Sequence, residues 1–148
     1  MDASHSPIPS PASSDAKWMA RAAGLADAAR AAGNIPVGAV VVLNGVVIAE
    51  AAESVPNGPR PFAHAEFVAV EAALMAHHDS LRAATLYSTA EPCILCGFAI
   101  REAGIGRVVM GREAGAIGSV RSRFPVLTDK GINRWGTPPE IVWYAGKS

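Results

Sequence analysis

The 148-residue sequence has only two cysteines, no excess of either charge (13 basic and 13 acidic residues) and no long apolar run. Two cysteines cannot form a four-cysteine metal site or a disulfide framework. The balanced charge, without a Lys/Arg cluster, argues mildly against nucleic acid as a partner. No segment approaches the roughly 18 apolar residues of a membrane span, and the N-terminus lacks a signal-peptide layout. These absences predict a cytoplasmic protein with no membrane partner.

The composition is sufficient for one domain. Half of the residues are hydrophobic, which allows a sizeable core in a chain of this length. The first residues are instead rich in Pro and Ser, a composition that cannot form a core. We therefore expect a disordered tail over residues 1–14 and a single domain over residues 15–148.

The first half of that domain begins with a helix and a hairpin. Apolar residues recur at helical spacing from Asp15, the expected N-cap, to about Ala32. Two short β-branched runs follow, over residues 37–43 and 46–50. Asn44-Gly45 between them favours a hairpin, because both turn positions require a positive φ. Residues 51–63 are expected to form a loop.

Helices and strands alternate in the second half. A helix is expected from His64, with Phe67, Val70 and Leu74 on its buried side, and another with Pro92 in its first turn that ends near Gly104. Short strands are expected over residues 85–89, 107–110 and 141–144. This order predicts a layered α/β domain with an antiparallel hairpin at one sheet edge.

Three residues are candidate metal ligands. Cys93 and Cys96 are three apart, which places both sulfurs on one face of a helical turn. A helix N-terminus there would favour the thiolate forms that bind zinc. His64 can join them only if it lies at the very start of its own helix, so two helix N-termini must meet at the metal. With one His and two Cys ligands, the fourth position of a tetrahedral Zn²⁺ stays open for water, as in catalytic sites.

Glu66 completes the pattern as a carboxylate that is not needed as a ligand. Zinc lowers the pKa of bound water to about 7, and Glu66 could transfer a proton from that water to a substrate nitrogen. Backbone groups near Ala65, Glu91 and Cys93 are expected to hold the reacting substrate. A structural zinc site would instead need a fourth ligand, yet on a straight helix His77 and His78 would lie roughly 20 Å from His64.

With these residues the chain resembles the cytidine deaminase-like superfamily. H-x-E … P-C-x-x-C is the signature of its zinc deaminases, in which the Glu acts in proton transfer. Residues 36–42, 104–111 and 115–119 are similar to segments of the branch that holds tRNA adenosine, guanine and cytosine deaminases. The resemblance covers residues 16–120. It implies a three-layer α/β/α fold around a mixed five-stranded sheet, and a homodimer whose subunits help to shape each other's pockets.

One residue departs from the pattern of that branch. Its members normally carry Asn at the end of the second strand, where the amide holds the base or sugar, and a count from Pro36 places Glu53 there. A carboxylate accepts hydrogen bonds but cannot donate them as an amide does, so Glu53 suits a substrate rich in N–H groups. Phe62 and Trp135 could stack on an aromatic substrate ring, although packing in the core or at an interface is an equal alternative for both.

The sequence thus predicts a zinc-dependent hydrolase that deaminates a free guanine-like or cytosine-like base or a similar aminated heterocycle and releases ammonia. The alternative within the enzyme class is a tRNA adenosine-to-inosine deaminase, which the neutral charge and Glu53 oppose. A more remote alternative is a zinc-binding scaffold without activity, which would have an occluded pocket or a fourth protein ligand.

Overall fold

The computed structural model describes residue 12 and residues 14–144. Most of the predicted tail (residues 1–14) thus lies outside the described residues. The elements in chain order are α1 (Asp15–Ala31), β1 (Gly38–Leu43), β2 (Val46–Ala52), α2 (Ala65–Ala76), β3 (Thr85–Ala90), α3 (Ile94–Ala103), β4 (Arg107–Arg112), the 3-10 turn η1 (Gly115–Ile117) and β5 (Glu140–Trp143).

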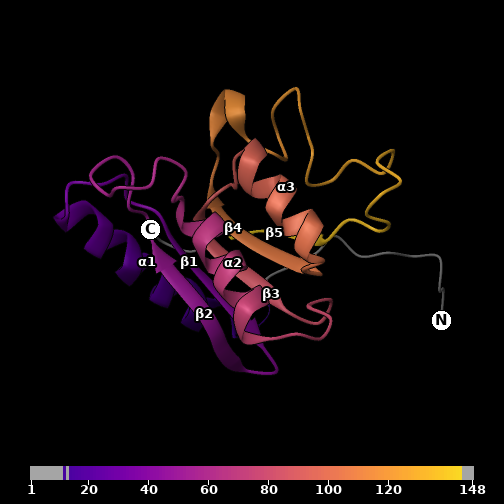
Figure 1. Cartoon of the computed structure of the whole chain (residues 1–148), viewed down its shortest axis with the longest axis horizontal. Helices are drawn as coiled ribbons and strands as arrows, with labels where there is room; N and C mark the ends of the chain where they lie inside the picture. Colours follow the sequence, from indigo (N-terminus) through magenta and orange to yellow (C-terminus); the bar gives the residue numbers. More distant parts are fainter. Residues whose placement is uncertain (1–11, 13, 145–148) are drawn as a thin grey trace.

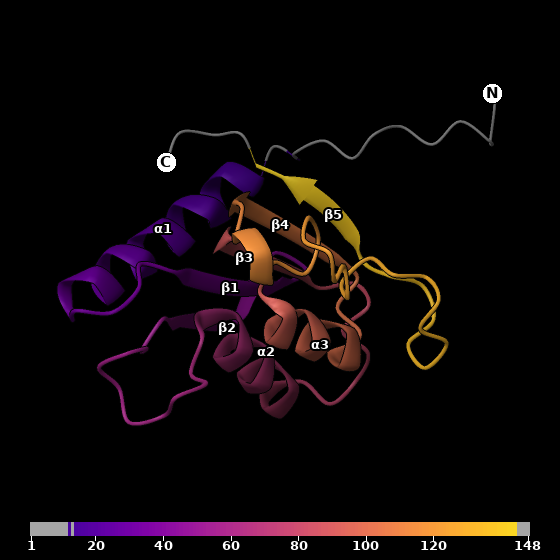
Figure 2. The same ribbon diagram turned by 90° about the horizontal axis from the view of Figure 1, so that it is seen from above.

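The strands form one mixed sheet in the order β2-β1-β3-β4-β5. β1 is antiparallel to both β2 and β3, whereas β3, β4 and β5 are mutually parallel. Helix α1 covers one face of the sheet, and α2 and α3 lie together on the other (Figures 1 and 2). The predicted three-layer α/β/α fold with a mixed five-stranded sheet is confirmed. No helix among the described residues is long and apolar enough to cross a membrane.

Strand β1 lies in the middle of the core because both of its faces are apolar. Val41 packs toward α2 and α3, whereas Val40 and Val42 pack toward α1. The close approach of α1 depends on Gly38, since a Cβ at that position would overlap the backbone carbonyl of Ala22. At the other end of β1, Asn44 and Gly45 adopt φ values of 52° and 76°, as the predicted hairpin turn requires.

Two local predictions, on α3 and α2, were wrong. Helix α3 begins at Ile94 with Cys93 as its N-cap, so Pro92 precedes the helix and does not lie in its first turn. In α2 the sheet-facing positions are held by alanines and Val70, which leaves Phe67 half-buried and Leu74 44 % exposed. Small alanine side chains allow α2 to lie close to the sheet, and this orientation turns Leu74 outward.

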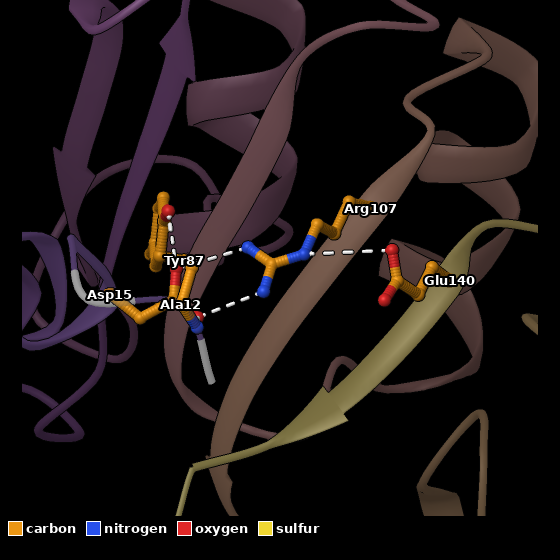
Figure 3. A network of polar contacts seen from close by, with 5 residues as sticks. All are labelled: Ala12, Asp15, Tyr87, Arg107 and Glu140. Carbon is orange, nitrogen blue, oxygen red and sulfur yellow. Dashed lines mark hydrogen bonds and ion pairs between the residues drawn. The ribbon is translucent and has the colours of Figure 1, made fainter. Parts of the chain in front are cut away.

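Asp15 was also assigned the wrong role. The N-cap of α1 is Ser14, and Asp15 is a fully buried residue of the first turn. Its carboxylate accepts two hydrogen bonds from Arg107, of 3.0 and 2.8 Å, and one from the Tyr87 hydroxyl at 2.7 Å (Figure 3). Arg107 also lies 3.6 Å from Glu140 of β5. One buried acid therefore joins the start of α1 to β3 and β4.

The electrostatics of this network favour the ionised acid. Burial raises the pKa of the Asp15 carboxyl, but the hydrogen bonds from Arg107, Tyr87 and the Ala12 N–H outweigh it and hold the pKa below its ordinary value of 3.8. A lowered pKa in the folded state means that ionised Asp15 stabilises the fold. This contribution is complete above the pKa of the unfolded chain and is lost as the pH falls through that of the folded protein.

We expect Asp15→Asn to lower the free energy of unfolding by roughly 2–3 kcal/mol at pH 7, because Arg107 would lose its charged partner. The difference from the wild type should shrink as the pH falls below about 4. Denaturant unfolding at pH 7 and pH 3 measures both effects. Asp27→Asn, which alters an exposed ion pair with Arg30 on the same helix, is the control and should leave stability unchanged. A difference independent of pH would contradict this account.

Candidate metal centre

His64, Cys93 and Cys96 converge at one point of the structure. Their ligand atoms lie within 4.8 Å of one another, and they form the sole His/Cys/Asp/Glu group of this kind in the described part of the chain. Nδ1 of His64 is 3.4 Å from the Cys93 sulfur and 3.6 Å from the Cys96 sulfur. Tetrahedral Zn²⁺ with bonds of about 2.0 Å to nitrogen and 2.3 Å to sulfur separates such atoms by roughly 3.5 Å. The donor set therefore fits zinc.

The convergence arises from two helix N-termini. His64 is the N-cap of α2, Cys93 is the N-cap of α3, and Cys96 lies in the first turn of α3. This is the condition that the two-residue spacing of His64 and Glu66 imposed on the zinc hypothesis, and it is met. His77 follows the last residue of α2 and does not belong to the group, nor does His78. In the described structure the group thus has three protein ligands.

The site favours a thiolate at Cys93. Hydrogen bonds from Cys96 and from the His64 ring outweigh the effect of burial and lower the pKa of the Cys93 thiol to about 5. The positive ends of two helix dipoles point at the same place and act in the same direction. A negatively charged sulfur beside a second thiol and an imidazole nitrogen is the donor set expected of a zinc site.

Glu66 is the second residue of α2, in its first turn, and is 4 % exposed. Its Oε2 is 3.2 Å from the hydroxyl of Ser88 on β3, which also lies 2.7 Å from the Ala90 carbonyl. The hydroxyl has one proton, so it can donate to only one of these acceptors at a time. Burial raises the pKa of Glu66 to about 7, and the nearby charges of Cys93 and Glu53 also raise it. Glu66 is therefore a buried acid that can gain and lose a proton near neutral pH.

Glu53 directly follows β2 and lies beside the ligand group. It is buried, and its Oε1 accepts a 2.8 Å hydrogen bond from the backbone N–H of Ala65, the first residue of α2. His64 is the N-cap residue, but its side chain makes no capping hydrogen bond. Glu53 replaces it by accepting a hydrogen bond from an N–H group of the first turn of α2. Burial raises the pKa of Glu53, against the opposing hydrogen bond from Ala65. The Ala65 N–H, expected to hold substrate, is thus engaged by Glu53.

Glu91 does not point toward the ligand group, although it is two residues from Cys93. Its carboxylate is 2 % exposed and accepts hydrogen bonds from the backbone N–H groups of Ala114, Val120 and Arg121. Its own N–H donates to the Arg112 carbonyl at 2.7 Å. The backbone N–H of Glu91 is thus engaged within the fold, and the expectation that backbone groups near Glu91 hold substrate stays a prediction.

The two aromatic candidates differ in their surroundings. Phe62 is 67 % exposed and lies two residues before His64. Trp135 donates a 2.7 Å hydrogen bond to Glu102 and packs edge-on against Phe98, both on α3. It also lies under the guanidinium of Arg101. These contacts attach Trp135 to α3, and none of them is with a member of the ligand group.

Residues 12–112 match the family model described as the cytidine and deoxycytidylate deaminase zinc-binding region. The chain belongs to this family. It is accordingly a hydrolytic deaminase of the zinc-dependent type, with zinc as its cofactor and His64, Cys93 and Cys96 available to bind it.

Among similar proteins is the tRNA-specific adenosine deaminase of Haemophilus influenzae, 39 % identical over 121 residues that cover 80 % of this chain and 70 % of that one. A structure from a study of A-to-I editing by tRNA:A34 deaminases superimposes with a TM-score of 0.77 at 30 % identity, covering 87 % of this chain and 98 % of that one. Guanine deaminase from Bacillus subtilis superimposes with a TM-score of 0.62 at 35 % identity, covering 66 % and 64 %. The family is the predicted one.

Ser88 was not identified from the sequence, although it is fully buried and contacts Glu66. The available signal was a serine inside a predicted central strand, because a buried hydroxyl needs a hydrogen-bond partner. The partner itself comes from α2, and sequence separation gives no indication of that contact.

We expect Cys96→Ala to weaken zinc binding by at least about 100-fold, because removing a ligand should cost more than removing an outer-shell partner does. Zinc content after dialysis against a chelator, measured by atomic absorption, is the readout. Ser88→Ala is the matched control, since it alters a buried residue beside Glu66 without removing a ligand. Equal zinc content in Cys96→Ala and the wild type would show that Cys96 is not a ligand.

Proposed function

We propose that this protein deaminates adenosine in tRNA, with His64, Cys93 and Cys96 as zinc ligands and Glu66 as the proton-transfer residue. The observation that carries the reaction class is the placement of a buried carboxylate beside a three-ligand zinc set. The substrate assignment is supported by similarity to the tRNA-specific enzymes, which extends over more of both chains than the similarity to guanine deaminase.

Zinc bound to such a set supplies a water molecule that loses a proton near neutral pH. Glu66 accepts this proton and passes it to the ring nitrogen next to the amino-bearing carbon, while the water oxygen bonds to that carbon. Glu66 then takes the second proton of that oxygen and donates it to the departing amine, so that a C=O bond replaces the C–N bond. One water is consumed, the C–N bond breaks, and ammonia leaves. Ser88 can stabilise either state of Glu66, because its hydroxyl can donate to the carboxylate or accept from the carboxylic acid.

A second candidate is the free aminated base that the sequence favours. Glu53 supports it, because its buried carboxylate lies beside the ligand group in place of the amide expected from the resemblance. One of its oxygens is occupied by the Ala65 N–H. The remaining acceptor capacity of the carboxylate suits a substrate that presents N–H groups, as guanine does.

The scaffold alternative required a fourth protein ligand or an occluded site. In the described residues the ligand group has three members, and His64 and Cys93 are partly accessible. Neither condition of the scaffold alternative is therefore met there.

The homodimer implied by the resemblance stays a prediction. Several large apolar side chains are exposed on α2, α3 and η1 and could serve such an interface: Leu74, Met75, Phe98 and Ile117.

We expect Glu66→Gln to retain zinc and to lose activity by about 10²–10⁴-fold, the usual contribution of a positioned acid–base group. Ammonia release and inosine formation from an anticodon stem-loop with a wobble adenosine measure the activity, and metal analysis measures the zinc. Glu71→Gln, which alters an exposed acid on the same helix, should behave as the wild type. A fully active Glu66→Gln enzyme would disprove the proposed mechanism.

A comparison of the stem-loop with free guanine, cytosine and adenine decides between the two candidates. Deamination of the stem-loop alone supports the proposal, and deamination of a free base alone supports the second candidate. We expect Glu53→Asn to leave zinc content unchanged and to shift the ratio of the two activities about tenfold or more toward the stem-loop, because it restores an amide donor. The control is Glu50→Gln, which changes an acid on β2 itself that pairs with Arg21. An unchanged ratio would remove Glu53 from the substrate site.

A further inference from the structure

The chain after β4 leaves the sheet and returns to the metal centre in an irregular segment, residues 113–121. Its only helical part is the short turn η1. Irregular backbone near a site needs other hydrogen-bond partners than those of helices and sheets. Glu91 supplies three of them: Oε1 accepts from Ala114 at 2.9 Å, and Oε2 accepts from Val120 at 2.8 Å and from Arg121 at 2.9 Å.

The same segment is attached to the metal-binding turn. Gly118 forms a β-bridge with Cys93. Ser119, which is fully buried, donates both its N–H and its hydroxyl to the Pro92 carbonyl, at 2.9 and 2.6 Å. Residues 113–121 therefore lie directly against the turn that carries Cys93, and the Glu91 carboxylate binds the backbone of the same segment.

The segment packs closely at two glycines. A Cβ at Gly118 would overlap the Glu91 carboxylate, and a Cβ at Gly97 would meet Ser119 at 2.6 Å. Gly118 therefore allows the segment to contact Glu91 this closely, and Gly97 allows it to approach α3. A carboxylate is the side chain that this cluster of donors requires, because each of its oxygens accepts hydrogen bonds. A glutamine would direct an N–H₂ group at one set of donors.

We propose that Glu91 is a positioning residue that fixes residues 113–121 against Cys93 as one wall of the substrate site. The inference rests on the proposed function, because residues 113–121 are taken to line the site that binds the substrate of that reaction. Within the described part of the chain, the Glu91 carboxylate hydrogen-bonds only to the N–H groups of Ala114, Val120 and Arg121, and not to the ligand atoms or Glu66. Its loss should therefore weaken substrate binding and leave proton transfer and zinc retention intact.

Glu91→Gln tests this proposal in the full-length, zinc-loaded protein. We expect KM for the preferred substrate to rise about tenfold with kcat changed less than about threefold, the pattern of a lost binding contribution. Hydrogen exchange of the amides of residues 114, 120 and 121 should accelerate about tenfold or more, since each loses a charged acceptor. Zinc content should stay at the wild-type level.

Glu102→Gln is the matched control. Glu102 also holds part of the irregular C-terminal region, through Arg134 and Trp135, but from the distal part of α3. It should leave KM and the three amides unchanged. Gly118→Ala provides a second variant, because its added Cβ would overlap the Glu91 carboxylate and force the segment and the carboxylate apart; it should reproduce the KM increase.

Faster exchange without a change in KM would overturn the proposal, because Glu91 would then be structural only. Loss of zinc in a folded Glu91→Gln protein would also overturn it, since Glu91 would then support the metal centre. Failure of the proposed function is separate, because it would show as a wild-type protein that is inactive on every substrate of the panel.

Discussion

The structure depends on the meeting of two helix N-termini at one point. His64 and Cys93 are both N-caps with extended backbone, and neither side chain caps its own helix. Their side chains turn toward each other instead, which places three donor atoms where both helix dipoles are positive. The arrangement requires α2 and α3 to lie side by side on one face of the sheet, and the strand order β2-β1-β3-β4 places them there.

Four buried acids, two of them beside the ligand group, differ in how many hydrogen-bond donors surround them. Asp15 is neutralised by Arg107, and Glu91 is satisfied by three backbone N–H groups. Glu53 accepts one N–H, and Glu66 shares one hydroxyl with a carbonyl. The acids with the fewest donors are thus the two beside the ligand group. Burial is costly for an ionised acid without donors, so proton exchange is easiest where the donors are fewest.

The sequence was most informative where a pattern is local. Helical periodicity, the Asn44-Gly45 turn and the Cys93-x-x-Cys96 spacing each depend on residues close in the chain, and they identified the main elements and the ligand turn. The two-residue spacing of His64 and Glu66 also required His64 to lie at the very start of its helix, and the structure places it there as the N-cap of α2. It misplaced Asp15, because the choice between a cap and a buried partner depends on Arg107, which is 92 residues away from Asp15. Ser88 and the side-chain role of Glu91 were missed for the same reason.

The irregular C-terminal region explains why the sequence predicts the reaction class better than the substrate. The metal centre is built from helix starts, whose residues follow a short motif. The region after β4 is instead held by single side chains that bond to backbone: Glu91 to three N–H groups, and Arg101, itself buried, to the carbonyls of Val126, Asp129 and Gly136. Such contacts leave no periodic pattern in the sequence. They also allow this region to vary without disturbing the ligands, so proteins that share the metal motif can differ in substrate, as the tRNA adenosine and guanine deaminases similar to this chain do.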